Sequence, residues 1–279
     1  MLALAIAVLS TSTFALIMRH TQRRGRDQMA VMAVNYVVAS SAGFALAHGV
    51  GAWHVSPPTL RIGLVAGIIY VTTYVLILHS MELRGVAIAN AVIRLSVLVP
   101  IVAAVVIWRE RPDLVQQVGA ALAVTAMPFL ALDGTQRVAP LRKRQLALLI
   151  GLFLTNGAVL ITSKWFHAAA PPSENFMYFG ILYGLSAVIS WGLWLGWSRR
   201  CRPADVGWGA LLGVVNILTG TTLLAALDAL PGTVVFPVFA ALGLALTTAF
   251  AAIAWREVPG RLGRVGIGVA ICAAVLINL

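Results

Sequence analysis

One arginine inside a long apolar run is the residue with the clearest chemical meaning. Arg94 lies nine residues after Gly85, so at about 1.5 Å per helical residue it sits roughly 13 Å into the run, near the middle of a bilayer. An unpaired Arg there costs at least about 2.5–3.5 kcal/mol, so it should face the protein interior. A guanidinium suits a carboxylate or phosphate, so Arg94, with Asn90 one turn away, indicates a site for an anionic solute. The alternative is a structural pair with Glu82 or Asp228.

The acidic residues are informative through their positions. All nine lie in connections or near the ends of apolar runs, at 27, 82, 110, 113, 133, 174, 205, 228 and 257. Without a carboxylate near the midplane, a permeant cation or proton has no obvious partner, which argues against a pump for cationic drugs. Glu82 and Asp228 end the third and eighth runs at nearly matching places. They are interpreted either as gates or proton carriers, or as solvated charges.

Uncharged polar side chains inside other runs indicate a polar cavity. The further candidates for solute binding are Asn35, Tyr70, Tyr74, Asn156, Asn216 and Thr219. Hydrogen bonding between helices, which is common in membranes, is the alternative for each of them.

The sequence contains no arrangement of residues that is typical of a catalytic or metal site. The five His residues lie at the ends of apolar runs, and the two Cys residues have no metal-ligand spacing. No G-x-x-x-x-G-K-[ST] phosphate loop occurs, so the chain itself is not expected to hydrolyse ATP. The sequence predicts no catalytic centre, no metal site and no cofactor.

The apolar runs are long enough to cross a membrane. The 279 residues are 60% hydrophobic and 10% charged, far below the charge of a soluble domain, and the mean hydropathy is +0.93. The ten predicted transmembrane helices are 2–18, 29–47, 60–79, 86–108, 113–132, 145–165, 176–196, 207–227, 232–254 and 262–279. The net charge of +11 arises from short basic clusters between them, so nucleic acid is not an expected partner.

Lys and Arg are shared unevenly between alternate connections. The odd-numbered connections hold 15 of them and the even-numbered ones 4. The basic side should be cytoplasmic, which predicts that both termini lie outside and that Cys201 lies in a cytoplasmic loop.

An internal repeat relates the two halves at an offset of 147 residues. Trp108-Arg109-Glu110-Arg111-Pro112 recurs as Trp255-Arg256-Glu257-Val258-Pro259, Gly85 falls on Gly232, and Val118-Gly119 falls on Val265-Gly266. We therefore predict two five-helix repeats, 1–135 and 145–279. An odd number of spans inverts the second repeat relative to the first, an arrangement typical of alternating-access transporters.

These motifs resemble a known family. Five spans per half, Pro100 within the fourth span, the Trp-Arg-Glu-Arg-Pro motif and Gly119 are similar to EamA-type members of the drug/metabolite transporter superfamily. The last quarter also resembles small multidrug resistance proteins. The resemblance implies a cavity lined by the first, third, fourth, sixth, eighth and ninth spans, and it implies cytoplasmic termini. The acid that small multidrug resistance proteins carry in their first span is absent, since that span reads Ser10-Thr11-Ser12-Thr13.

The leading hypothesis is a multi-pass transporter of a bacterial inner membrane that exports a small anionic or zwitterionic metabolite by alternating access. Two alternatives remain: an exporter of multidrug or cationic compounds, and a lipid-handling or accessory subunit of the same fold. The expected partners are the small-molecule substrate and the lipid bilayer. The sequence leaves open whether two copies form a homodimer.

Glycine pairs four residues apart predict close packing between helices. They are Gly63 and Gly67, Gly180 and Gly184, and Gly209 and Gly213. Pro100, Pro128 and Pro237 each remove a backbone donor and are candidate hinges or static kinks.

Overall fold

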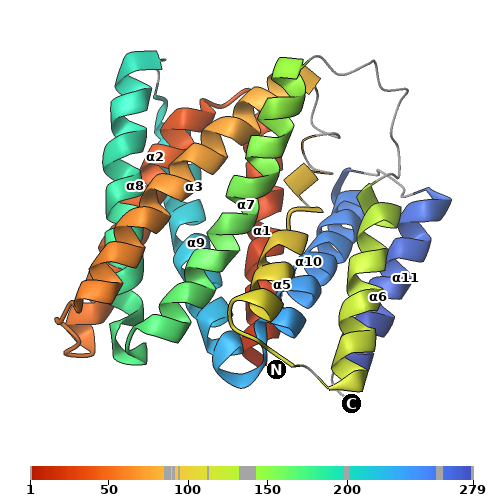
Figure 1. Ribbon diagram of the computed structural model, residues 1–279. Helices are drawn as coiled ribbons and strands as arrows, with labels where there is room; N and C mark the ends of the chain where they lie inside the picture. Colours follow the sequence, from red (N-terminus) through yellow and green to blue (C-terminus); the bar gives the residue numbers. More distant parts are fainter. Residues whose placement is uncertain are drawn as a thin grey trace. The chain divides into compact units, whose positions relative to one another are not determined.

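The computed structural model describes residues 2–84, 89, 92–93, 95–111, 113–131, 143–197, 201–255 and 260–277. Apart from a short 3-10 turn, η1 (Pro172–Glu174), its elements are α-helices (Figure 1). They are α1 (Leu2–Arg23), α2 (Gln28–Gly49), α3 (Pro57–Arg84), α5 (Leu98–Val106), α6 (Leu114–Ala131), α7 (Lys143–Ala169), α8 (Asn175–Trp197), α9 (Pro203–Ala229), α10 (Gly232–Trp255) and α11 (Arg261–Ile277). No strand occurs within the described ranges, in keeping with the cost of unpaired strand edges in lipid.

Each predicted span contains helical residues, and several helices run beyond the apolar sequence. α1 continues past Met18 to Arg23, where basic side chains favour the negative end of the helix. In the described part, seven segments are long and apolar enough to cross a membrane by length and composition: Leu2–Arg23, Gln28–Gly49, Pro57–Met81, Lys143–Ala169, Pro172–Gly196, Pro203–Ala229 and Gly232–Phe250. The chain is therefore a multi-pass helical membrane protein.

The chain divides into two compact units, and each unit takes segments from both halves of the sequence. Unit 1 contains 72–161 and 226–279, and unit 2 contains 2–71 and 162–225. The long helices α3, α7 and α9 each contribute residues to both units.

Two glycines set the packing of α2 against α8 in unit 2. A Cβ atom at Gly43 would come within 2.7 Å of the backbone nitrogen of Gly180, and one at Gly184 would meet the Ser40 hydroxyl at 3.1 Å. The Ser40 hydroxyl donates to the Gly180 carbonyl at 2.9 Å. Gly43 contacts Gly180, whereas Ser40, which comes earlier in α2, also contacts Gly184, which comes later in α8. The two helices are therefore antiparallel.

The other glycine pairs bring α9 onto α2 and α3 onto α8. Cβ atoms at Gly209 and Gly213 would each lie 2.7 Å from a carbonyl oxygen of α2, and one at Gly67 would lie 2.8 Å from the Leu182 carbonyl oxygen of α8. These contacts confirm the predicted role of the glycine pairs in close packing. Such close approach strengthens van der Waals contact between helices where lipid offers no hydrophobic driving force.

In unit 1, α6 packs chiefly against α11, and α10 packs against α5, α6 and α11. α7 approaches the start of α5 at Gly157, where a Cβ atom would meet the Val99 side chain at 2.4 Å. Pro237 lies inside α10, one turn and a half from its start.

If successive spans cross the membrane in opposite directions, every second connection lies on the same side. Connections on the same side contact each other in the structure. In unit 2, Arg26 between α1 and α2 pairs with Asp205 at the start of α9 at 3.9 Å. On the other side, Ser56 between α2 and α3 donates from its hydroxyl to Glu174 between α7 and α8 at 2.8 Å. Both contacts agree with the alternation of spans that the sequence predicts for unit 2.

Candidate functional site

A chain of polar side chains links α2, α9 and α8 inside unit 2. The Tyr183 hydroxyl donates to the Asn216 side-chain oxygen at 3.1 Å, and the Asn216 amide donates to the Asn35 side-chain oxygen at 3.3 Å. Asn35 is fully buried and Tyr183 is buried. The structure therefore brings two of the predicted binding residues, Asn35 and Asn216, into direct contact.

Aromatic rings surround these hydrogen-bonded side chains. The Tyr183 ring stacks on Tyr36 with centroids 6.0 Å apart, and it meets the edge of Tyr70 at 5.9 Å. Tyr178 stacks on Phe166 at 4.2 Å, and its hydroxyl donates to Thr162 at 3.4 Å. Four of the five tyrosines of the chain thus belong to unit 2, in a buried region rich in hydroxyl groups.

Sequence reasoning did not select Tyr178 or Tyr183. A signal for Tyr183 was present, because it lies 147 residues after Tyr36, at the offset of the internal repeat. The stacking of Tyr36 on Tyr183 is therefore a contact between equivalent positions of the two halves.

The remaining predicted residues make other contacts. Thr219 donates to the carbonyl of Val215 in its own helix at 2.8 Å. In unit 1, Asn156 donates to the Ser96 hydroxyl at 2.6 Å and joins α7 to the turn before α5. Tyr74 is buried in the part of α3 that belongs to unit 1.

Most of the charged residues that were predicted to act in binding or gating lie outside the described residues. Arg94 and Asn90 lie outside the described residues, as does the side chain of Glu82. Asp228 is exposed near the end of α9.

Two of the acidic residues that lie in connections or near the ends of apolar runs are buried. Glu174 exposes 3% of its surface and Asp205 exposes 1%. Glu174 accepts hydrogen bonds from the Ser56 backbone and hydroxyl at 3.0 and 2.8 Å, so its charge is satisfied by two donors. The sequence could not show this burial because the partners lie 118 residues away.

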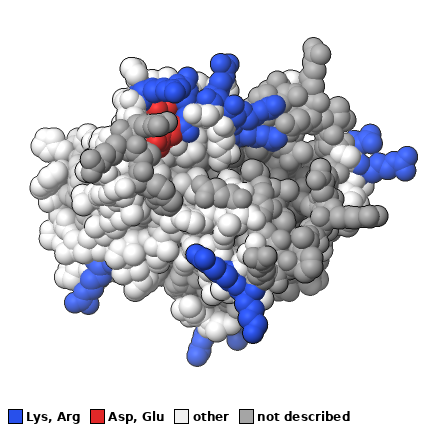
Figure 2. All heavy atoms as spheres, turned by 90° about the horizontal axis from the view of Figure 1, so that it is seen from above, with Lys and Arg blue, Asp and Glu red and all other residues white. Residues whose placement is uncertain are grey.

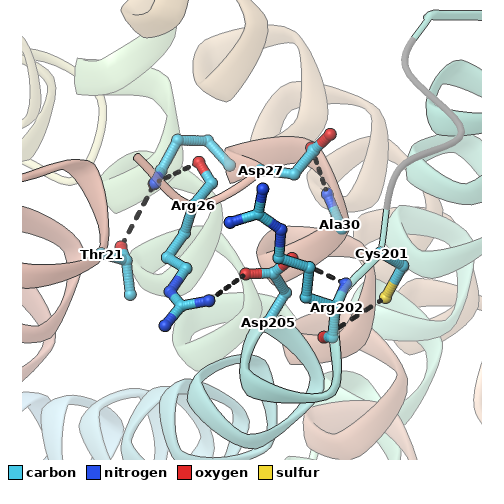
Figure 3. A network of polar contacts seen from close by, with 8 residues as sticks. Thr21, Arg26, Asp27, Ala30, Cys201, Arg202 and Asp205 are labelled. Atoms are coloured by element: carbon cyan, nitrogen blue, oxygen red, sulfur yellow. Dashed lines mark hydrogen bonds and ion pairs between the residues drawn. The ribbon is translucent and has the colours of Figure 1, made fainter. Parts of the chain in front are cut away.

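The surroundings of Asp205 form a polar network at one end of unit 2 (Figure 3). Asp205 accepts a hydrogen bond from the Arg202 backbone at 2.9 Å and pairs with Arg26, while Asp27 caps α2 through the Ala30 backbone at 3.0 Å. Lys and Arg side chains outnumber acidic ones on the face seen from above in Figure 2. This network holds two connections together at that end of the unit.

One buried cation was also missed. Lys164, in α7, exposes only 8% of its surface, and it directly follows the buried Ser163. Its charge therefore faces protein and not lipid, which is typical of functional positions within a span. Lys164 lies at the end of the predicted sixth span, 145–165, and is one of the four basic residues assigned to the even-numbered connections.

This region of unit 2 has the chemistry of solute recognition by neutral groups. Amide and hydroxyl groups can donate to or accept from a solute, and aromatic faces can stack on it. Among the described residues, no group of three or more His, Cys, Asp or Glu side chains is arranged to hold a metal ion.

Comparisons with known proteins agree with the helical membrane fold. Residues 1–132 match the model of the EamA-like transporter family. A solved crystal structure of another protein, 16% identical, superposes with a TM-score of 0.79 over 99% of this chain and 94% of that chain. At such low identity this likeness shows the fold alone. No curated protein matches the sequence. The first 132 residues of this membrane protein therefore belong to the EamA-like transporter family, which confirms the resemblance seen in the sequence.

Proposed function

We propose that the protein is a secondary transporter that works by alternating access between two inverted five-helix repeats. The observation that carries the proposal is the repetition of helix boundaries. α2 begins at Gln28 and α8 at Asn175, and α6 begins at Leu114 and α11 at Arg261, so both pairs are 147 residues apart. This is the offset at which the sequence itself repeats.

Helix packing supports the same relation. Helices at equivalent positions pack on each other, α2 on α8, α6 on α11 and α5 on α10. The glycine contacts repeat as well. Gly209 approaches the Val31 carbonyl of α2, and Gly63 approaches the Tyr178 carbonyl of α8, and these two carbonyls are 147 residues apart. Antiparallel packing of equivalent helices is what an inverted repeat requires.

The composition of the two units fits this mechanism. A shift of 147 residues places 226–279 on 79–132 and places 162–225 on 15–78, so each unit combines nearly equivalent parts of both halves. Alternating access needs bodies that are related in this way, because exchange of their conformations opens the pathway to the other side.

The proposed substrate is a small anionic or zwitterionic metabolite, moved outward across a bacterial inner membrane. Arg94 would bind its acidic group, with Asn90 beside it. Asn35, Asn216 and Tyr70 would supply hydrogen bonds, and we extend the same proposal to Tyr74, Asn156 and Thr219.

Export of cationic compounds is a second candidate, favoured by the tyrosine cluster. Aromatic faces attract cations, and burial strengthens the attraction. The Tyr183 ring lies 6.0 Å from the Tyr36 ring and 5.9 Å from the Tyr70 ring.

Counterflow across liposomes tests the transporter directly. Purified protein alone should exchange labelled for unlabelled solute without a pH gradient, and the Glu82→Gln, Asp228→Asn double mutant should retain this exchange. Exchange is expected because no carboxylate was predicted near the midplane. A requirement for a second protein would favour the accessory-subunit alternative. Complete loss of exchange in folded double mutant would instead assign proton coupling to these two carboxylates.

Orientation can be tested at Cys201, which is exposed between α8 and α9. With both termini outside, a membrane-impermeant maleimide should leave Cys201 unlabelled in sealed cells and should label it in inverted vesicles. Cys272→Ala removes the other thiol. Labelling of Cys201 in sealed cells would support the cytoplasmic termini that the family resemblance implies.

The labelling reaction should itself depend on pH. Burial, together with the charges of Asp205 and Asp27, raises the pKa of the Cys201 thiol. A raised pKa lowers the thiolate fraction at neutral pH, so the rate in inverted vesicles should increase as pH rises. Asp205→Asn should increase the rate at neutral pH, because it removes one of the charges that oppose ionisation.

A further inference from the structure

The carboxylate of Glu110 contacts the first turn of α10 within unit 1. Its Oε1 accepts a hydrogen bond from the Gly232 backbone at 3.0 Å, and its Oε2 accepts one from the Thr233 backbone at 2.9 Å. Glu110 lies in the connection between α5 and α6, 122 residues from Gly232. An ionised carboxylate is favoured here by two donors and by the positive end of the helix.

The backbone leading to Glu110 is strained. Arg109 has φ of 52°, in the left-handed region that residues other than glycine rarely adopt. The Glu110 backbone then donates to the Ala104 carbonyl at 3.2 Å. A strained residue persists only where its surroundings hold it, and the bidentate contact to α10 does so here.

The internal repeat retains both residue types of this contact. Glu110 falls on Glu257, and Gly232 falls on Gly85, among the few positions that agree at the offset of 147. Glu257 and Gly85 lie outside the described residues. Retention of both partners indicates that the contact does more than cap one helix.

A proton on Glu110 would have an acceptor. The Thr233 hydroxyl oxygen is buried and has no hydrogen-bond partner within the described residues. It belongs to the residue whose backbone already contacts Oε2. The contact thus contains two donors for the ionised carboxylate and one free acceptor for its protonated form.

We propose that Glu110 is a proton-coupling residue, which rests on the transport function proposed above. Ionised Glu110 holds the first turn of α10. Protonation removes the charge and one of the two acceptor positions, and this frees the turn that precedes Pro237. In the proposed orientation this connection faces outward, so protons from outside would reach it.

Other charged groups lie close to this contact in the sequence. In the described part, Arg109, Arg111 and Asp113 lie on the same connection, and Asp228 lies four residues before Gly232. The first turn of α10 carries no acidic residue. A test must therefore separate Glu110 from Asp113 and Asp228 by substitution.

Hydrogen exchange of the Gly232 and Thr233 amides, measured on the full-length protein in detergent, tests the proposal. At pH 7, Glu110→Gln should lower their protection by about 10- to 100-fold, the effect of losing one charge-assisted hydrogen bond. In wild type, protection should fall as the pH is lowered below about 4, because the two donors and the helix end favour the ionised form, whereas in Glu110→Gln it should not change. Glu257→Gln makes the same chemical change in the other motif and should leave these two amides protected, as should Asp113→Asn and Asp228→Asn.

The outcomes separate this proposal from the proposed function. Equal protection in wild type and Glu110→Gln overturns the contact, and protection that is independent of pH in wild type overturns the proton response. Equal loss in Glu257→Gln would show a general destabilisation and would also overturn it. If Glu110→Gln does not fold, Glu110→Asp, which keeps the charge but shortens the side chain, should show a smaller loss with the pH response preserved. Absence of counterflow in liposomes would contradict the transport function and leave the exchange result intact.

Discussion

Replacement of Arg94 with Gln should leave the protein folded and lower its affinity for an anionic substrate by about 10- to 100-fold. A charge-assisted hydrogen bond contributes about 1.5–3 kcal/mol, and its loss sets this range. Arg94→Lys keeps the charge but loses the planar fork, so its affinity should fall between those of Arg94→Gln and wild type. Binding and melting temperature should be measured on the same samples, after a stabilisation screen of metabolite classes has supplied a ligand. At 100 times its Kd, such a ligand adds about 2.7 kcal/mol of stability.

A matched control is the exposed Arg61 at the start of α3. Arg61→Gln removes the same charge and should change neither affinity nor stability. If Arg94 is structural, both of its replacements should lower the melting temperature while the surviving protein binds normally. Normal binding by Arg94→Gln would refute the anion hypothesis and would favour the cationic compounds that the tyrosine cluster suits.

Gly43→Ala should destabilise the protein by about 1–3 kcal/mol, the usual cost of overpacking. The added methyl would lie 2.7 Å from the Gly180 nitrogen and 3.1 Å from the Phe176 carbonyl oxygen. Because both atoms belong to the backbone, neither can turn aside as a flexible side chain would. The helices α2 and α8 would have to separate, and the Ser40 hydrogen bond between them would lengthen. Thermal unfolding in detergent measures the effect.

Gly192→Ala is the control for this substitution. Gly192 lies in α8, and an added methyl there would have nothing within 4 Å. The substitution should be neutral or slightly stabilising, because alanine has the higher helix propensity. Equal melting temperatures for Gly43→Ala and Gly192→Ala would contradict the close packing of α2 on α8.

The sequence by itself determined the helices, the repeat and the family. Crossing a bilayer requires about 20 apolar residues with every backbone group paired inside the segment, and that requirement is local. It can therefore be predicted from the sequence, and seven described segments are long and apolar enough to cross a membrane. The role of the glycine pairs could also be predicted from the sequence, because close approach of helices depends on the absence of a side chain at particular positions. The offset of 147 was visible because Trp108-Arg109-Glu110 recurs as Trp255-Arg256-Glu257.

Only the tertiary structure decided which polar groups meet. Asn216 reaches Asn35 across 181 residues of sequence, and Glu110 reaches Gly232 across 122. Glu174, which the sequence places in a connection, is buried, and Ser56 of a distant connection supplies its donors. Hydropathy reports whether a residue tolerates lipid or water, but a buried polar atom is stabilised by a partner at about 3 Å. Which partner lies there depends on where helices from the two halves pack against each other. The pattern of residues along one segment does not give that packing.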